Sequence, residues 1–82
     1  MEIKVLGPGC SNCKKLHAET EKALHQLGLT ASVTKVEKID EIVAYGAMMT
    51  PALVVNGKVR AAGRIPSQAE LTSWLATAAT EE

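Results

Sequence analysis

The sequence of 82 residues is poor in aromatic side chains. It contains no phenylalanine, one tryptophan and one tyrosine, Tyr45. The core must therefore be aliphatic, and the chain lacks the aromatic platform on which nucleic-acid bases stack. Lysine plus arginine and aspartate plus glutamate number nine each, so the formal net charge is zero. Without a basic stripe we expect no nucleic-acid partner.

Long apolar runs are also missing. No stretch approaches the roughly 20 residues that span a bilayer, and the segment 1–4 leads directly into a strand rather than into a signal peptide. We therefore expect no membrane span and a cytoplasmic location. Cysteine is limited to Cys10 and Cys13, and in the cytoplasm such a close pair is more often catalytic or metal-binding than a structural crosslink.

The length and an apolar content of 46% predict a single globular domain over residues 1–82. The hydrophobic pattern predicts strands over 2–6, 31–36, 52–55 and 58–62, and helices over 11–27, 39–45 and from 67 onward. The first two strands, joined by a helix, should be parallel neighbours. Asn56-Gly57 predicts a hairpin, and the spacing from Ser67 to Glu70 predicts a capping box.

Finer expectations concern the second helix and the loop behind it. Ile39, Ile42 and Val43 are expected to form the buried face of that helix. Met48 and Met49 are expected to provide adaptable packing near the active centre rather than a soft-metal site.

The two cysteines lie at a junction between a strand and a helix, in Gly7-Pro8-Gly9-Cys10-Ser11-Asn12-Cys13. The first turn of a helix carries unpaired N–H groups and the positive end of the helix dipole, so it stabilises an anion. We therefore expect the pKa of the Cys10 thiol to be lowered and Cys10 to be the nucleophile. Cys13, on the first turn, is the natural resolving thiol, and the glycine at Gly9 leaves the Cys10 sulfur open to a large partner.

Metal binding is the rival interpretation. A structural zinc site needs four ligands; His17 lies one turn from Cys13 and His25 is out of reach, so we expect no zinc site. A copper or mercury chaperone also carries C-x-x-C between its first strand and first helix, but continues from its second strand into a hairpin, whereas residues 38–46 here have a helical pattern. A redox-regulated binding protein that uses the same disulfide as a switch stays open.

The order of elements, the C-x-x-C after the first strand and Met49-Thr50-Pro51 before the third resemble the thioredoxin superfamily in its minimal, glutaredoxin-sized form. The resemblance implies an α/β fold, β-α-β-α-β-β-α, with a mixed four-stranded sheet in the order 2-1-3-4 and helices on both faces. It implies a thiol–disulfide oxidoreductase with Cys10 and Cys13 as catalytic residues. It further implies that Pro51 follows a cis peptide bond beside the cysteines, that the backbone of Thr50 pairs with substrate, and that Gly63 lies in a loop at the same groove.

The departures from the family pattern bear on the reductant. The dipeptide between the cysteines is Ser11-Asn12, and the glycine and aspartate with which glutaredoxins bind glutathione near the last helix are not found. The resemblance therefore implies an NADPH-fed, thioredoxin-reductase-like flavoprotein as electron donor, protein disulfides as substrates, no bound cofactor beyond the redox-active disulfide, and a monomer. Arg64 could contact a partner or be a solvated side chain.

Overall fold

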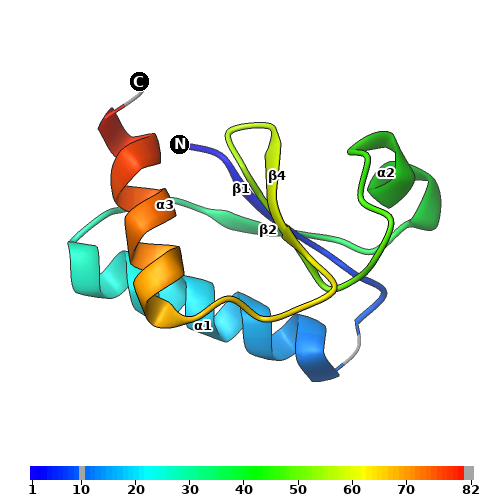
Figure 1. Ribbon diagram of the computed structural model, residues 1–82, viewed down its shortest axis with the longest axis horizontal. Coiled ribbons are helices and arrows are strands. Elements are labelled where there is room, and N and C mark those ends of the chain that lie inside the picture. Colours follow the sequence, from blue (N-terminus) through cyan, green and yellow to red (C-terminus); the bar gives the residue numbers. More distant parts are fainter. Residues whose placement is uncertain (10, 81–82) are drawn as a thin grey trace.

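The computed structural model describes residues 1–9 and 11–80 and has the predicted order of elements (Figure 1). Cys10 and residues 81–82 lie outside the described residues. The elements are β1 (Ile3–Leu6), α1 (Ser11–Leu27), β2 (Val33–Val36), α2 (Ile39–Ala44), β3 (Ala52–Val55), β4 (Lys58–Ala62) and α3 (Gln68–Thr80). The predicted bounds differ from these by two residues or fewer at each strand end, with β2 beginning at Val33 instead of residue 31.

The four strands form one mixed sheet in the order β2-β1-β3-β4, which confirms the predicted fold class. β1 is parallel to β2 and antiparallel to β3, and β3 is antiparallel to β4. Asn56 and Gly57 both have positive φ, 50° and 80°, which is the backbone that a two-residue hairpin turn requires. The segment after β2 is the helix α2, so the chain lacks the hairpin of a copper chaperone at that point.

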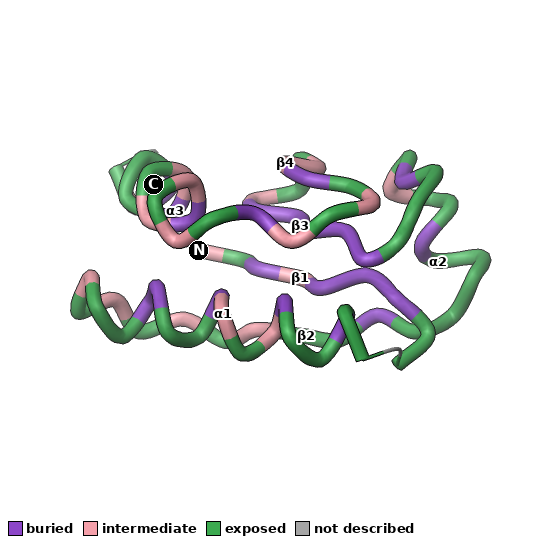
Figure 2. The backbone as a smooth tube through the Cα atoms, turned by 60° about the horizontal axis from the view of Figure 1, so that its bottom comes forward, coloured by how far each residue is buried: buried purple, intermediate pink, exposed green. Residues whose placement is uncertain are grey.

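The core is aliphatic and is split by the sheet. One cluster joins α1 and α3 to the sheet through buried residues that include Ile3, Leu16, Leu53 and Leu71. The other lies under α2 and centres on Leu6, Ile42 and Val54. Figure 2 shows the buried positions of α1 on the side that faces the strands, so the helices cover both faces of the sheet as predicted.

Both long helices have the ends that their sequences predict. At the end of α1, Gly28 has φ +68°, and the N–H of Leu29 donates to the carbonyl of Leu24 at 3.0 Å, as in a left-handed helix cap. Before α3, the Ser67 N–H donates to Glu70 Oε1 at 3.1 Å and the Glu70 N–H to Ser67 Oγ at 3.2 Å. This is the predicted capping box.

The expected buried face of α2 is wrong in two of three positions. Ile42 is 3% exposed, but Ile39 and Val43 are 64% and 62% exposed. The reason is the length of α2: six residues turn only one side toward the cluster beneath them, and positions 39 and 43, one turn apart, share a different side.

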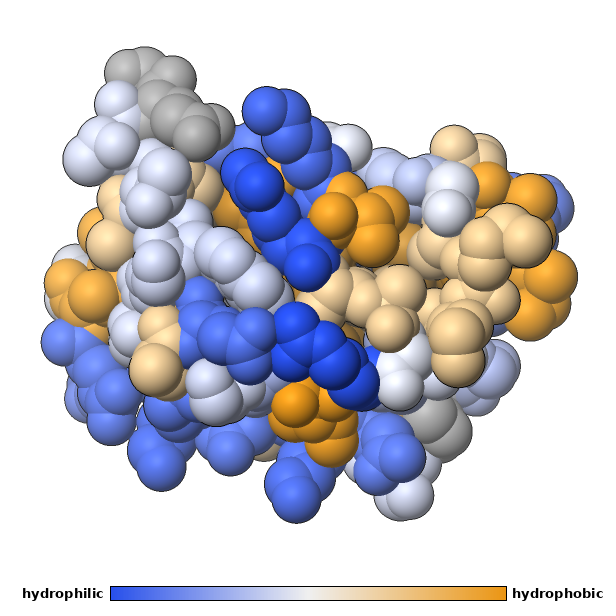
Figure 3. Space-filling view, viewed as in Figure 1, coloured by the Kyte–Doolittle hydropathy of each residue, from blue (hydrophilic) through white to orange (hydrophobic). Residues whose placement is uncertain are grey.

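The packing expected of the methionines is also wrong for Met48, which is 92% exposed, while Met49 is 62% exposed. Figure 3 shows apolar surface gathered over the α2 side of the molecule.

Among the helices of the described residues, none is long and apolar enough to cross a bilayer.

Candidate functional site

Cys13 lies on the first turn of α1, with its side chain turned into the protein. It is 5% exposed, and α1 begins at Ser11, two residues earlier. The sulfur fits because residue 7 has no side chain: a β-carbon on Gly7 would lie 2.2 Å from Cys13 Sγ. Gly7 is itself fixed at the end of β1, where its N–H donates to the carbonyl of Val36 at 2.9 Å. The backbone of the first loop therefore forms one wall of the Cys13 site.

The loop before β3 reaches the same place from the other side. A β-carbon on Gly7 would be 3.8 Å from Thr50 Cβ, so Cys13 Sγ and Thr50 both border the space beside Gly7. Thr50 is exposed, the bond from Thr50 to Pro51 is cis, and Pro51 is buried. Two motifs that are 37 positions apart in the sequence thus meet at one point of the structure.

Gly63 lies next to the Thr50-Pro51 loop. Its N–H donates to the carbonyl of Pro51 at 2.9 Å, which ties the segment after β4 to this loop. The side chain of Met49 lies across Gly63: a β-carbon there would be 2.9 Å from the Met49 ε-carbon. Because Gly63 also has φ +76°, both the backbone and the close contact favour glycine.

Arg64 is held within the chain. Its guanidinium donates to both carboxylate oxygens of Glu70, at 3.0 and 2.8 Å. This contact, with the Ser67 N–H as a second donor, lowers the pKa of Glu70 to about 2, and the same carboxylate raises the pKa of Arg64. The ion pair fixes the segment after Gly63 to the start of α3, which neither sequence-based interpretation of Arg64 foresaw.

Gly9 is exposed with φ +85° and has a different neighbour. A β-carbon on Gly9 would lie 3.3 Å from Glu37 Oε2. Apart from the residues next to Gly9 in the chain, no other described residue has a heavy atom within 4 Å of that β-carbon. Gly9 therefore lies beside the segment after β2, and it lines the same cavity as Cys13. Thr50 comes close to Cys13 at Gly7, and Gly63 is joined to Pro51 by a hydrogen bond. Cys10 lies outside the described residues.

The sequence analysis missed two charged residues at this site. A cavity of about 320 Å³ next to Cys13 is lined by Lys35 on β2 and by Glu37 just beyond it, as well as by Lys14 on α1. A signal for them existed in the sequence. Parallel strands end at the same edge of a sheet, so the residues following β2 were bound to lie beside the loop that follows β1.

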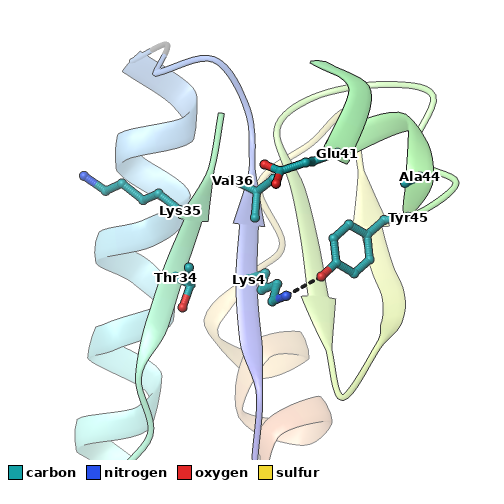
Figure 4. A pocket seen from close by; sticks show the side chains of 7 residues that line it. All are labelled: Lys4, Thr34, Lys35, Val36, Glu41, Ala44 and Tyr45. Atoms are coloured by element: carbon teal, nitrogen blue, oxygen red, sulfur yellow. Dashed lines mark hydrogen bonds between the residues drawn. The ribbon is translucent and has the colours of Figure 1, made fainter. Parts of the chain in front are cut away.

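A second groove, of about 520 Å³, lies on the α2 side of the sheet (Figure 4). Tyr45 and Lys4 meet in it, the Lys4 ammonium donating to the Tyr45 hydroxyl. This hydrogen bond, followed by the nearby charge of Glu2 at 3.7 Å, raises the pKa of Lys4. Figure 4 shows Lys35 pointing away from Lys4 and Tyr45. The Lys4–Tyr45 contact lies within this groove, and Lys35 lines both the groove and the Cys13 cavity.

Comparison with known proteins agrees with this arrangement. Residues 1–76 match the family model described as thioredoxin domain. A thioredoxin of Methanothermobacter thermautotrophicus is 33% identical over 75 residues, which cover 92% of this chain and 97% of the relative. A thioredoxin of Methanocaldococcus jannaschii is 30% identical over 73 residues, which cover 89% of this chain and 84% of the relative. The chain therefore belongs to the thioredoxin family of thiol–disulfide oxidoreductases.

Proposed function

We propose that Cys10 and Cys13 form the redox-active couple of this oxidoreductase and exchange electrons with protein disulfides. The observation that carries the proposal is the meeting of Cys13 Sγ and Thr50 beside Gly7. A substrate segment lying along Thr50 would be within reach of the cysteine motif. The other support is chemical: Cys10 directly precedes α1, a helix of 17 residues, and a helix start favours a thiolate.

In the proposed reaction the Cys10 thiolate attacks one sulfur of a substrate disulfide, which breaks that bond and forms a mixed disulfide with Cys10. The first substrate thiolate leaves and takes up a proton. Cys13 then loses its proton and attacks the Cys10 sulfur, so that the second substrate thiolate leaves. The protein ends with a Cys10–Cys13 disulfide, and the substrate has gained two electrons and two protons.

Thr50, Pro51, Gly63 and Gly9 are proposed to bind substrate. Thr50 supports this because it is exposed at the loop before β3, with Pro51 buried behind it. Gly63 supports it through its hydrogen bond to Pro51 and the lack of a side chain that would crowd the groove. Gly9 is the exposed residue directly before Cys10, where a side chain would obstruct an approaching partner.

The remaining parts of the proposal concern the setting of the reaction. We propose one domain acting as a monomer in the cytoplasm, with no cofactor beyond the disulfide. Its reducing equivalents would come from NADPH through a thioredoxin-reductase-like flavoprotein rather than from glutathione. The test is to oxidise the protein and measure its reduction by a thioredoxin reductase with NADPH and, separately, by glutathione. Faster reduction by glutathione would contradict the proposed donor.

The cysteine roles are tested with insulin as a protein disulfide substrate. Cys13→Ser should accumulate a covalent complex through Cys10, visible on a non-reducing gel and released by dithiothreitol, because the resolving thiol is missing. Cys10→Ser should form no such complex and should not reduce insulin. Full turnover by either variant would overturn the assignment.

A further inference from the structure

Two exposed methionines precede the Thr50-Pro51 loop, and the second of them packs against the site. Met48 is 92% exposed and Met49 is 62% exposed. Leaving aside the residues next to Gly63 in the chain, the three heavy atoms nearest to a β-carbon on Gly63 all belong to Met49: Cε at 2.9 Å, Cβ at 3.1 Å and Sδ at 3.2 Å. The Met49 thioether therefore lies on the bare backbone of Gly63 while its residue stays open to solvent.

The backbone beneath the Met49 side chain is held in place. The Gly63 N–H donates to the Pro51 carbonyl at 2.9 Å, and Arg64, the next residue, pairs with Glu70 at 2.8 Å. Met49, in contrast, has a flexible side chain with three rotatable bonds. Any added bulk or polarity above Gly63 is therefore taken up by a displacement of Met49 and not by the segment after β4.

The position of Met49 in the chain couples it to the proposed substrate site. Met49 directly precedes Thr50, whose Cβ comes close to the Cys13 sulfur at Gly7. A protein segment lying along Thr50 would cover the thioether, which is apolar and gives up its water at little cost. Oxidation to the sulfoxide converts such a flexible apolar side chain into a polar one, so the same cover would then be unfavourable.

We propose that Met49 is a modification site, at which a hydroperoxide forms methionine sulfoxide and thereby slows exchange with protein disulfides. The inference rests on the proposed function, because it regulates the substrate site of that reaction. The Met49 sulfur attacks the hydroxyl oxygen of the peroxide, the O–O bond breaks and an S–O bond forms. The sulfur is oxidised by two electrons. The leaving oxygen takes up the proton of the transferred hydroxyl and departs as water or as an alcohol.

The sulfoxide acts through its polarity. Its oxygen binds water, which a protein segment covering residue 49 has to remove. We expect the rate with insulin to fall about tenfold, the order of effect of burying one polar group without a full set of hydrogen bonds. A small aromatic disulfide needs access to the cysteine motif alone, so its rate should not change.

The first experiment needs no oxidant. Met49→Gln places a polar, unbranched side chain where the sulfoxide would be, and Met48→Gln makes the same change at the more exposed neighbour. The rate of insulin reduction with dithiothreitol and the rate with 5,5′-dithiobis(2-nitrobenzoate) are measured for both. We expect Met49→Gln to slow the reaction with insulin about tenfold and to spare the reaction with the small disulfide, while Met48→Gln changes neither.

The second experiment tests the modification itself. The protein is oxidised to its disulfide form, which protects the cysteine sulfurs, and is treated with hydrogen peroxide until peptide mass spectrometry shows the sulfoxide; catalase then removes the excess. Met48→Leu can carry the sulfoxide at Met49, and Met49→Leu can carry it at Met48. Met1 is present in both variants, so its oxidation affects them equally. Each variant is compared with its own untreated sample.

We expect the treatment to lower the insulin rate of Met48→Leu and not that of Met49→Leu. Methionine sulfoxide reductases supplied with dithiothreitol should restore the lost rate, because they act on both epimers of the sulfoxide. This recovery separates the sulfoxide at Met49 from irreversible damage to the cysteines or to the fold.

Equal insulin rates in Met49→Gln and Met48→Gln overturn the inference, and so does an equal loss with both disulfides in Met49→Gln. It is also overturned if Met49 stays unmodified while peroxide fully converts Met48, or if the sulfoxide at Met49 leaves the insulin rate intact. An untreated parent protein that does not reduce insulin contradicts the proposed function itself.

Discussion

Gly7 leaves open the space that the Cys13 sulfur occupies, so that a β-carbon on residue 7 would lie only 2.2 Å from Cys13 Sγ. Such a separation is far inside van der Waals contact, which for carbon begins at about 3.5 Å. Gly7 does not have the positive φ of the other loop glycines, so its requirement comes from the sulfur and not from the backbone. The end of β1 and the start of α1 are therefore fitted to each other at a single atom.

The first prediction is that Gly7→Ala lowers the free energy of unfolding by about 1–3 kcal/mol, the usual cost of overpacking a filled site. Urea denaturation of the reduced protein measures it. The matched control repeats the change in a Cys13→Ala background, where the sulfur is gone. The cost should shrink there, and equal costs in the two backgrounds would show that residue 7 and the sulfur do not interact.

A second prediction compares two isoleucines of α2. Ile42→Ala should cost about 2–5 kcal/mol in unfolding free energy, because Ile42 is 3% exposed within a packed cluster. Ile39→Ala, in the same helix at 64% exposure, should change it by less than about 0.5 kcal/mol. Thermal or urea unfolding of both variants measures the two losses of stability. Similar losses would mean that the side of α2 that carries Ile39 is also packed against the protein.

The third prediction concerns acid. Arg64 and the Ser67 N–H lower the pKa of Glu70 to about 2 in the folded protein, from an ordinary value of 4.5. A carboxyl whose pKa is lower when folded stabilises the fold above its unfolded pKa. This contribution should therefore be complete above about pH 4.5 and decline as the pH falls toward 2.

Urea unfolding across this range should show Glu70→Gln less stable than the parent protein at neutral pH, with the gap closing in acid. Arg64→Gln should raise the pKa of Glu70, which the side-chain carboxyl signal in an NMR titration would report. A gap that stays constant down to the lowest pH would rule out this linkage.

The fourth prediction separates two effects of a side chain at residue 63. Gly63 and Gly57 have similar φ, +76° and +80°, but only Gly63 has a neighbour, the Met49 side chain. Either change to alanine should cost about 1–2 kcal/mol for the left-handed backbone. Gly63→Ala should in addition push Met49 toward Thr50 and reduce the rate with insulin but not with a small aromatic disulfide. Equal insulin rates in the two variants would remove Gly63 from the substrate site.

Much of the fold could be predicted because its signals are local. Gly28 ends α1, Asn56 and Gly57 make the hairpin, and Ser67 with Glu70 starts α3, each through chemistry confined to a few consecutive residues. The parallel pairing of β1 and β2 followed from the helix between them. The thioredoxin resemblance added the sheet order, which local signals alone leave open.

Other parts of the site depend on distant contacts that no short pattern encodes. The nearness of Glu37 to Gly9 follows from the register of β1 and β2, and the filling of the Gly7 site by the Cys13 sulfur follows from the angle between β1 and α1. The exposure of Ile39 was misjudged because helical spacing identifies an apolar side but not whether a short helix turns that side to the core. Arg64 pairs with Glu70, six positions along the chain, which is also a member of the capping box at the start of α3.

β3 is buried at all four of its positions, and its alternate residues enter opposite clusters: Leu53 and Val55 the one beneath α1 and α3, Ala52 and Val54 the one beneath α2. Neither layer can loosen without disturbing the strand that serves both. Fluctuations that expose the amides of Leu53 and Val54 to solvent should then demand global opening, which makes these the slowest protons to exchange for deuterium.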